Sequence, residues 1–150
     1  MKTKSLFFFL LTWLTLAPGM LFSQGHYLTT PFQKVESIPD GKALIYLYRP
    51  KNYTGSAVHY AVNLNGEALF PHLYNGSYMV LFVDPGKQEF YAEVAKQYTA
   101  VVVEAEAGQT YFVRGSVVSG VWVGGPKLEL APEILAMKEI GKCKLLKTEK

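Results

Sequence analysis

The sequence predicts an all-β domain, either an antiparallel β-sandwich or a partly open barrel of about 7–9 strands, followed by a short C-terminal helix. Short apolar or alternating segments recur, separated by turn residues about every 8 to 12 positions. Residues that favour strands are abundant, with ten Tyr and nine Phe among 150 residues. Helical and strand patterns do not alternate along the chain, which argues against a parallel α/β fold.

The chain divides into four segments. Residues 1–23 have the pattern of a signal helix, 24–41 form an extended lead-in, 42–141 form the β-sandwich with its helix, and 142–150 are a basic tail expected to be mobile. The net charge of +3 includes two lysines of the leader, so the mature chain is close to neutral. Such a domain lacks the broad positive field of nucleic-acid-binding proteins, and we expect no nucleic-acid partner.

The leader combines a basic start at Lys2 and Lys4 with an apolar segment at 6–16 and a helix-breaking Pro18-Gly19. Ser23-Gln24 suits cleavage, so we expect a periplasmic, secreted or cell-surface location. The alternative is a retained anchor, because an apolar run of about 17 residues is at the short end for crossing a bilayer. Membrane contact is expected only in that case.

Cleavage before Gln24 would leave Gln24-Gly25-His26 at the mature N-terminus. A free amine followed by His in third position can bind Cu(II) or Ni(II) through four nitrogens. We favour the alternative, a frayed terminus whose Gln24 cyclises and blocks the amine. We therefore expect no metal and no cofactor.

The first strand, 43–49, is apolar on both faces and is ended by Pro50. The segment 58–64 alternates, and Asn65-Gly66 predicts a type I′ turn into a return strand at 67–70. Asn75-Gly76 marks another turn.

The segment 78–94 is predicted to organise the fold as one hairpin. Its first arm, 78–83, is apolar on both faces, its second arm, 87–94, alternates, and Asp84-Pro85-Gly86 joins them. Further strands are predicted at 99–106, 109–114, 117–123 and 127–130. The period then changes to that of a helix, with Pro132 suited to its first position and Gly141 to its end.

These residues resemble a bacterial family of domains of unknown function, DUF2846. The resemblance covers most of residues 41–140 and rests on Ala43-Leu-Ile-Tyr-Leu-Tyr-Arg-Pro50, Asn65-Gly66, Gly76-Ser-Tyr78, Asp84-Pro-Gly86 and Glu106-Ala-Gly-Gln-Thr-Tyr-Phe-Val-Arg114. The segment 78–90 is also similar to PEGA-type surface modules. The resemblance implies an exported, envelope-associated β-sandwich without an established activity. Lipoprotein relatives keep a cysteine after the leader; Ser23-Gln24 stands there in this chain, which argues against a lipid anchor.

Motifs of catalysis are missing, and we expect no enzyme. The sequence lacks Gly-x-Ser-x-Gly, His-Glu-x-x-His and a phosphate-binding glycine loop. His59 and His72 are thirteen positions apart, and no pattern is expected to bring them together. Glu104 and Glu106 could serve a small hydrolase as a carboxylate pair, but a solvated edge explains them more simply.

Binding residues are easier to nominate. Tyr46, Tyr48 and Tyr91 are predicted to form exposed aromatic surfaces for a protein or glycan of the cell envelope, and Arg49 and Arg114 to hold an anionic group. The alternative is a purely structural domain in which tyrosines cover a second apolar layer and the arginines face solvent. Lysines from Lys138 onward could touch an anionic surface, although a solvated helix end is the simpler interpretation.

Overall fold

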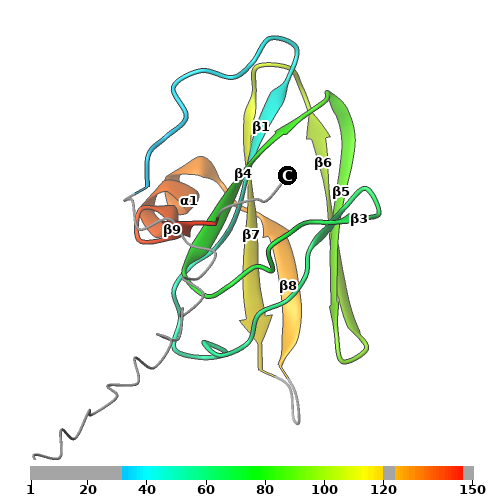
Figure 1. The fold of residues 1–150 in the computed structure, drawn as a ribbon, viewed down its shortest axis with the longest axis vertical. Coiled ribbons are helices and arrows are strands. Elements are labelled where there is room, and N and C mark those ends of the chain that lie inside the picture. Colours follow the sequence, from blue (N-terminus) through cyan, green and yellow to red (C-terminus); the bar gives the residue numbers. More distant parts are fainter. Residues whose placement is uncertain (1–31, 120–123, 147–150) are drawn as a thin grey trace, which may run out of the picture.

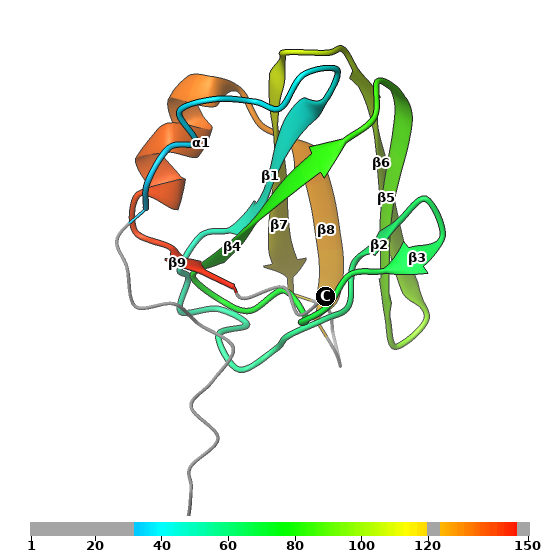
Figure 2. The same cartoon turned by 45° about the horizontal axis from the view of Figure 1, so that its top comes forward.

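The computed structural model describes residues 32–119 and 124–146, which form two sheets packed face to face with one helix outside them (Figures 1 and 2). The elements of this part of the chain are β1 (Ala43–Arg49), β2 (Asn63–Leu64), β3 (Glu67–Ala68), β4 (Ser77–Val83), β5 (Gly86–Val94), β6 (Gln97–Ala105), β7 (Thr110–Val118), β8 (Gly125–Leu130), α1 (Glu133–Ile140) and β9 (Lys144–Leu145). The predicted β-sandwich with a C-terminal helix is confirmed.

One sheet has the order β8-β7-β1-β4-β9 and the other has the order β3-β2-β5-β6. The pairing is mixed, because β1 runs parallel to β7 and β4 runs parallel to β9. The barrel is not closed. On one side β8 lies beside β6, where the Leu128 amide donates to Thr99 Oγ1 at 3.1 Å; on the other side an apolar groove opens between the β2–β3 hairpin and β4.

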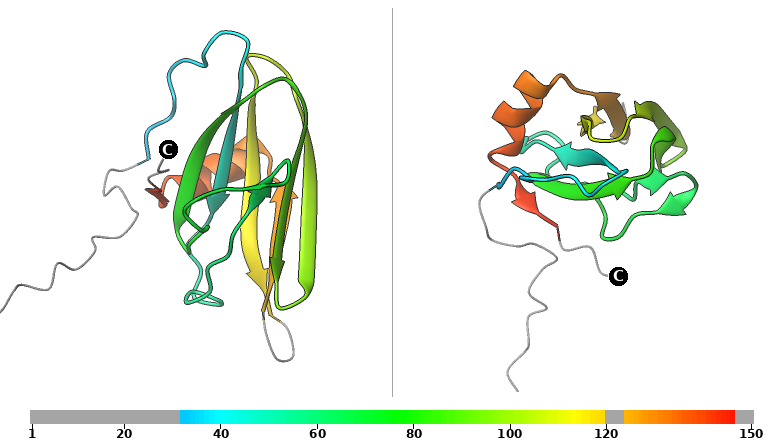
Figure 3. Two further views of the ribbon diagram at one scale, coloured as in Figure 1. Left: turned by 45° about the vertical axis from the view of Figure 1, so that its right-hand side comes forward. Right: turned by 90° about the horizontal axis from the view of Figure 1, so that it is seen from above.

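The predicted hairpin at 78–94 is wrong. β4 pairs with β1 along its whole length, from Ala43↔Val83 to Arg49↔Ser77, whereas β5 pairs with β2 and β6 in the other sheet. The Asp84-Pro85-Gly86 turn is therefore a corner between the two sheets (Figure 3, left). The turn residues predict the reversal of the chain, with Gly86 at φ 118°, but they do not determine which strand each arm pairs with.

Other boundaries shift while the turns stay in place. Asn65 and Gly66 have φ angles of 53° and 88°, which confirms the predicted turn, but each strand it joins is only two residues long. β7 continues through Gly115 to Val118, past the predicted end at Arg114. Residues 120–123, part of the predicted strand 117–123, lie outside the described residues, as does the leader.

β1 separates two apolar cores. Ile45 and Leu47 face the core between the sheets, whereas Leu44 and Tyr46 face a second core under α1. This confirms that both faces of β1 are apolar, and all seven of its residues are buried. Phe32, Val35 and Ile38 of the lead-in pack against the second core.

The C-terminal segment departs from its prediction. Pro132 lies at the N-cap of α1 and not at its first helical position. Gly141 ends the helix as predicted, with a right-handed conformation at φ −57°. Beyond the helix, Cys143 and Leu146 are buried and β9 pairs with the start of β4. The expectation that the chain is mobile from 142 is therefore wrong for residues 143–146; residues 147–150 lie outside the described part.

Candidate functional site

Tyr46 and Tyr48 do not form an exposed aromatic row, and that prediction is wrong. Both have no exposed surface, because α1 and the lead-in cover this face of β1. The Val35 amide donates to the Tyr46 hydroxyl at 2.8 Å, and the Tyr46 ring stacks on Phe112. The alternative, in which the tyrosines cover a second apolar layer, describes this face better. The two hydroxyl groups form hydrogen bonds with Val35 and Glu139 and do not reach water.

Arg49 is also buried, with 2% of its surface exposed. It therefore neither faces solvent nor lies at the surface, where it was predicted to hold an anionic group. Its guanidinium donates to the Val58 carbonyl at 2.6 Å and to the Gly55 carbonyl at 2.7 Å, and it lies 5.6 Å from the centroid of the Tyr60 ring. These contacts stabilise the loop that follows β1.

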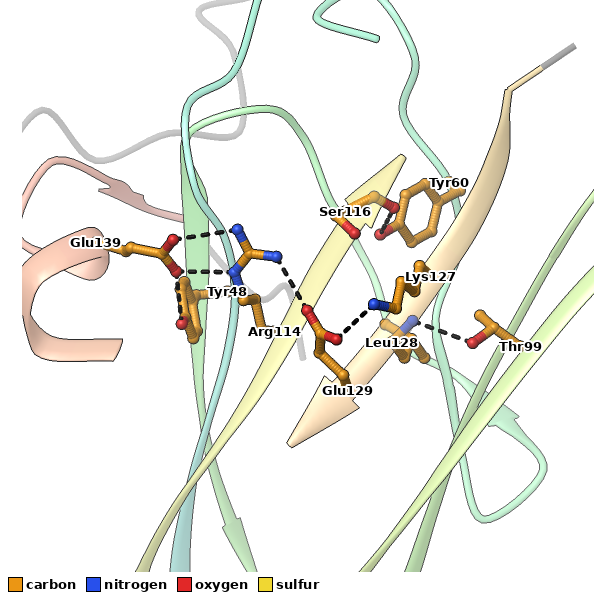
Figure 4. A network of polar contacts seen from close by, with 9 residues as sticks. All are labelled: Tyr48, Tyr60, Thr99, Arg114, Ser116, Lys127, Leu128, Glu129 and Glu139. Atoms are coloured by element: carbon orange, nitrogen blue, oxygen red, sulfur yellow. Dashed lines mark hydrogen bonds and ion pairs between the residues drawn. The ribbon is translucent and has the colours of Figure 1, made fainter. Parts of the chain in front are cut away.

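Arg114 belongs to a network between β7, β8 and α1 (Figure 4). Its Nε lies 2.8 Å from Glu139 Oε2 and its Nη1 lies 3.0 Å from Glu129 Oε1. Tyr48 donates to Glu139 at 2.9 Å, and Lys127 pairs with Glu129 at 2.6 Å. Two carboxylates therefore already neutralise the arginine that was predicted to hold an anion.

The ionisation of this network is fixed near neutral pH. Burial alone would raise the pKa of the Glu139 carboxyl, but hydrogen bonds from Arg114 and Tyr48 outweigh it and the pKa is lowered. Burial, followed by the hydrogen bond to Glu139, raises the pKa of the Tyr48 hydroxyl. Because neither group changes charge near pH 7, the contacts between Arg114, Glu139 and Tyr48 hold the helix in place throughout that range.

Tyr91 lies on the half-wet outer face of the four-stranded sheet, as predicted. Its ring centroid is 5.9 Å from that of Tyr98, which is 63% exposed. The sequence did not single out Tyr98, because its place near Tyr91 depends on the β5–β6 register. Tyr98 is paired directly with Glu93, so it lies diagonally across from Tyr91 on the same sheet face. A binding role for Tyr91 stays a prediction.

Four lysines gather around two adjoining hollows, which we call the lysine groove. One hollow, of about 220 Å³, is lined by Lys51, Asn75, Gly76, Lys142 and Lys144. The other, of about 250 Å³, is lined by Pro50, Lys51, Leu135, Lys138, Glu139 and Lys142. Lys51 and Lys142 line both hollows, so the two lie next to each other.

The backbone around the groove is well fixed. The Lys144 amide donates to the Gly76 carbonyl at 2.9 Å, which ties β9 to the turn before β4. The Asn75 side chain accepts a hydrogen bond from the Asn52 amide and donates one to the Asn52 carbonyl, each at 2.9 Å. Sequence reasoning noted the C-terminal lysines but missed Lys51, because only the folded chain brings the end of β1 beside the end of α1.

The groove is lined by more lysines than carboxylates among the described residues. Among the described residues, none of its four lysines makes an ion pair within 4.0 Å, whereas Lys34, Lys42, Lys87 and Lys127 each do. The carboxylate of Glu139 lines the groove but is held by Arg114 and Tyr48. Lysines that line one hollow give it a positive potential, which favours an anionic group such as a phosphate, sulfate or carboxylate.

Three other kinds of feature would indicate a different function in residues 32–119 and 124–146: a metal cluster, a carboxylate pair and a membrane-spanning helix. No group of three or more His, Cys, Asp or Glu residues there could hold a metal ion. Glu104 is exposed and faces Lys87 across the β5–β6 pair. No helix of this described part is long and apolar enough to cross a membrane.

The comparisons with known proteins are reported against this geometry. Neither a curated protein nor a solved structure is similar enough to this chain to count as a match. A family model described as "Protein of unknown function (DUF2846)" matches residues 39–126, from just before β1 into β8. Lys51, Asn75 and Gly76 of the groove lie within the match, and the other three lysines follow it. The match spans more than half of the chain, and the protein belongs to the DUF2846 family.

Proposed function

We propose that this protein is an exported, non-catalytic module of the cell envelope that binds an anionic glycan through the lysine groove. The observation that carries the proposal is that Lys51, Lys142 and Lys144 line one hollow and that none of them makes an ion pair with a described carboxylate. The apolar leader supports export, because a basic start, an apolar segment and a helix breaker are the parts of a signal peptide.

The size of the groove favours a glycan over a protein partner. Hollows of about 220 and 250 Å³ suit one or two charged sugar units. Concave sites of this kind are typical of small ligands, whereas protein partners dock on broader surfaces. The near-neutral mature chain argues against nucleic acid, whose binding needs a broad positive surface. Hydrolysis would need a group that can give or take a proton, and Glu139 is committed to Arg114 and Tyr48.

The direct experiment is retention of the purified protein on immobilised envelope polysaccharides. We expect retention on phosphate-bearing or carboxylate-bearing polymers, release as salt is raised, and no retention on the same polymers after their acidic groups are removed or blocked. Vesicles of anionic lipid serve as a second arm. Equal retention on charged and neutral polymers, or binding to the vesicles alone, would contradict the proposal.

A further inference from the structure

The fold brings together two histidines that sequence spacing alone keeps apart. His59 and His72 each precede one residue of the isolated antiparallel bridge Tyr60↔Leu73. Tyr60 and Leu73 are buried, with 2% and 0% of their surface exposed. Because successive side chains of an extended chain point to opposite sides, both histidines project outward. Their Nδ1 atoms lie 3.0 Å apart. The expectation that the two histidines are not brought together is therefore wrong.

The pair is held in place by its neighbours. The Leu73 amide donates to the Tyr60 carbonyl at 2.8 Å, which fixes the two backbones that carry the histidines. The Tyr74 ring stacks on the His59 ring with centroids 4.9 Å apart, and the two imidazole centroids are 5.3 Å apart. A metal ion would therefore meet two nitrogen ligands that are already close together.

We propose that His59 and His72 form a surface site for Cu(II), a site that is independent of the lysine groove. Two nitrogens bonded to one ion at about 2.0–2.1 Å lie about 2.9 Å apart when the bonds meet at a right angle, and about 3.4 Å apart at a tetrahedral angle. In the metal-free pair the 3.0 Å is a hydrogen-bond distance, and it already holds both nitrogens at the separation that one tetragonal ion needs once the rings turn their lone pairs toward it. Cu(II) prefers that geometry and binds nitrogen ligands more tightly than Ni(II) or Zn(II).

Binding of the ion changes the tautomer of one ring and leaves the number of protons and the oxidation state unchanged. In the metal-free pair, the Nδ1–H of one ring donates to the bare Nδ1 of the other. Cu(II) takes the place of that proton, which moves through solvent to the bare Nε2 of the same ring, so both rings stay neutral ligands with their protons on Nε2 and no net proton is released. Because the described residues provide no third His, Cys, Asp or Glu, water completes the coordination.

The test is titration of the full-length chain with Cu(II), followed by calorimetry and electron paramagnetic resonance. The chain has three histidines, so His59→Ala and His72→Ala are compared with the matched control His26→Ala, which removes the remaining histidine. We expect the control to bind one Cu(II) like the parent, with two imidazole nitrogens in the spectrum. Each of the other variants should bind at least about tenfold more weakly, because loss of a ligand costs more than loss of its supporting contacts.

Folding is checked by circular dichroism, and His59→Asn provides a second substitution at the exposed position. Zn(II) is titrated in parallel and should bind more weakly than Cu(II). Binding that survives in both His59→Ala and His72→Ala, or that disappears only in His26→Ala, would overturn the proposal.

Discussion

Arg114 of β7 and Glu139 of α1 form a two-bond ion pair, with Nε 2.8 Å from Oε2 and Nη2 3.1 Å from Oε1. The pair joins the helix to the sheet directly beside the lysine groove, because Glu139 also lines that groove. The position of Lys138 and Lys142, which flank Glu139 in sequence, therefore depends on this contact.

Replacement of Glu139 by Gln should destabilise the fold. The variant leaves a half-buried guanidinium with weaker partners, and we expect the free energy of unfolding to fall by about 2 kcal/mol. Glu133→Gln is the matched control on the same helix, because its pair with Lys34 is more than half exposed on both sides; we expect a loss below about 0.5 kcal/mol. Urea unfolding measures both, and equal losses would contradict the role of the network.

The same network predicts acid sensitivity. The folded-state pKa of Glu139 is lowered, so its contribution is complete above the unfolded-state pKa of about 4.3 and is lost as the pH falls through the lower folded value. Hydrogen bonds from Lys127 and Arg114 lower the pKa of Glu129 in the same direction. The difference in unfolding free energy between the parent and Glu139→Gln should shrink as the pH is lowered from 6 toward about 3. A difference that stays constant over this range would argue against the lowered pKa.

Cys143 should be unreactive until the protein unfolds. The thiol is 3% exposed, and burial together with the charge of Glu139 raises its pKa to about 12. At pH 8 very little thiolate is present and reagents cannot reach the sulfur. Reaction with a disulfide reagent such as DTNB should be slow in buffer and complete within minutes in denaturant. Fast reaction of the folded chain would show that the segment around β9 opens readily.

Tyr46 and Tyr91 should respond differently to truncation. Tyr46→Ala empties a fully buried position and should cost about 3–5 kcal/mol, whereas Tyr46→Phe loses the bond from the Val35 amide and should cost about 1 kcal/mol. Tyr91→Ala, on the outer sheet face, should cost less than about 1 kcal/mol. Thermal unfolding compares the three. Comparable losses for Tyr46→Ala and Tyr91→Ala would mean that α1 does not cover β1 as described.

Local patterns predicted the features that depend on a few neighbouring residues. The alternation in β5 placed Gln88, Phe90, Ala92 and Val94 on one face, and in the fold the first three are buried and Val94 is partly buried. Asn65-Gly66 correctly gave a tight turn, because only a few residue types accept positive φ at both positions. The two apolar faces of β1 agree with its complete burial. The arm 78–83, which the same pattern predicted to be buried from both sides, is only partly so, because Phe82 is 44% exposed.

Features that depend on contacts between distant segments could not be predicted in this way. A turn such as Asp84-Pro85-Gly86 can join two paired strands of a hairpin or two strands that belong to different sheets. Here the second arrangement forms because β4 pairs with β1. Lys51 and Lys142 line the same hollow because β9 pairs with β4. His59 and His72 come into contact through the Tyr60↔Leu73 bridge. An amphipathic pattern likewise does not show that α1 covers Tyr46 and Tyr48.

The central claim is that the lysine groove binds an anionic glycan, and the affinity of paired lysine variants tests it most directly. Calorimetry with a phosphate-bearing envelope polysaccharide compares the parent, Lys51→Ala/Lys142→Ala, and the control Lys34→Ala/Lys87→Ala, which removes the same charge from lysines outside the groove. The groove variant should bind at least about tenfold more weakly, because it loses two charge-assisted contacts, and the control should stay close to the parent. Equal affinity of all three proteins, or equal weakening of both variants, would contradict the account.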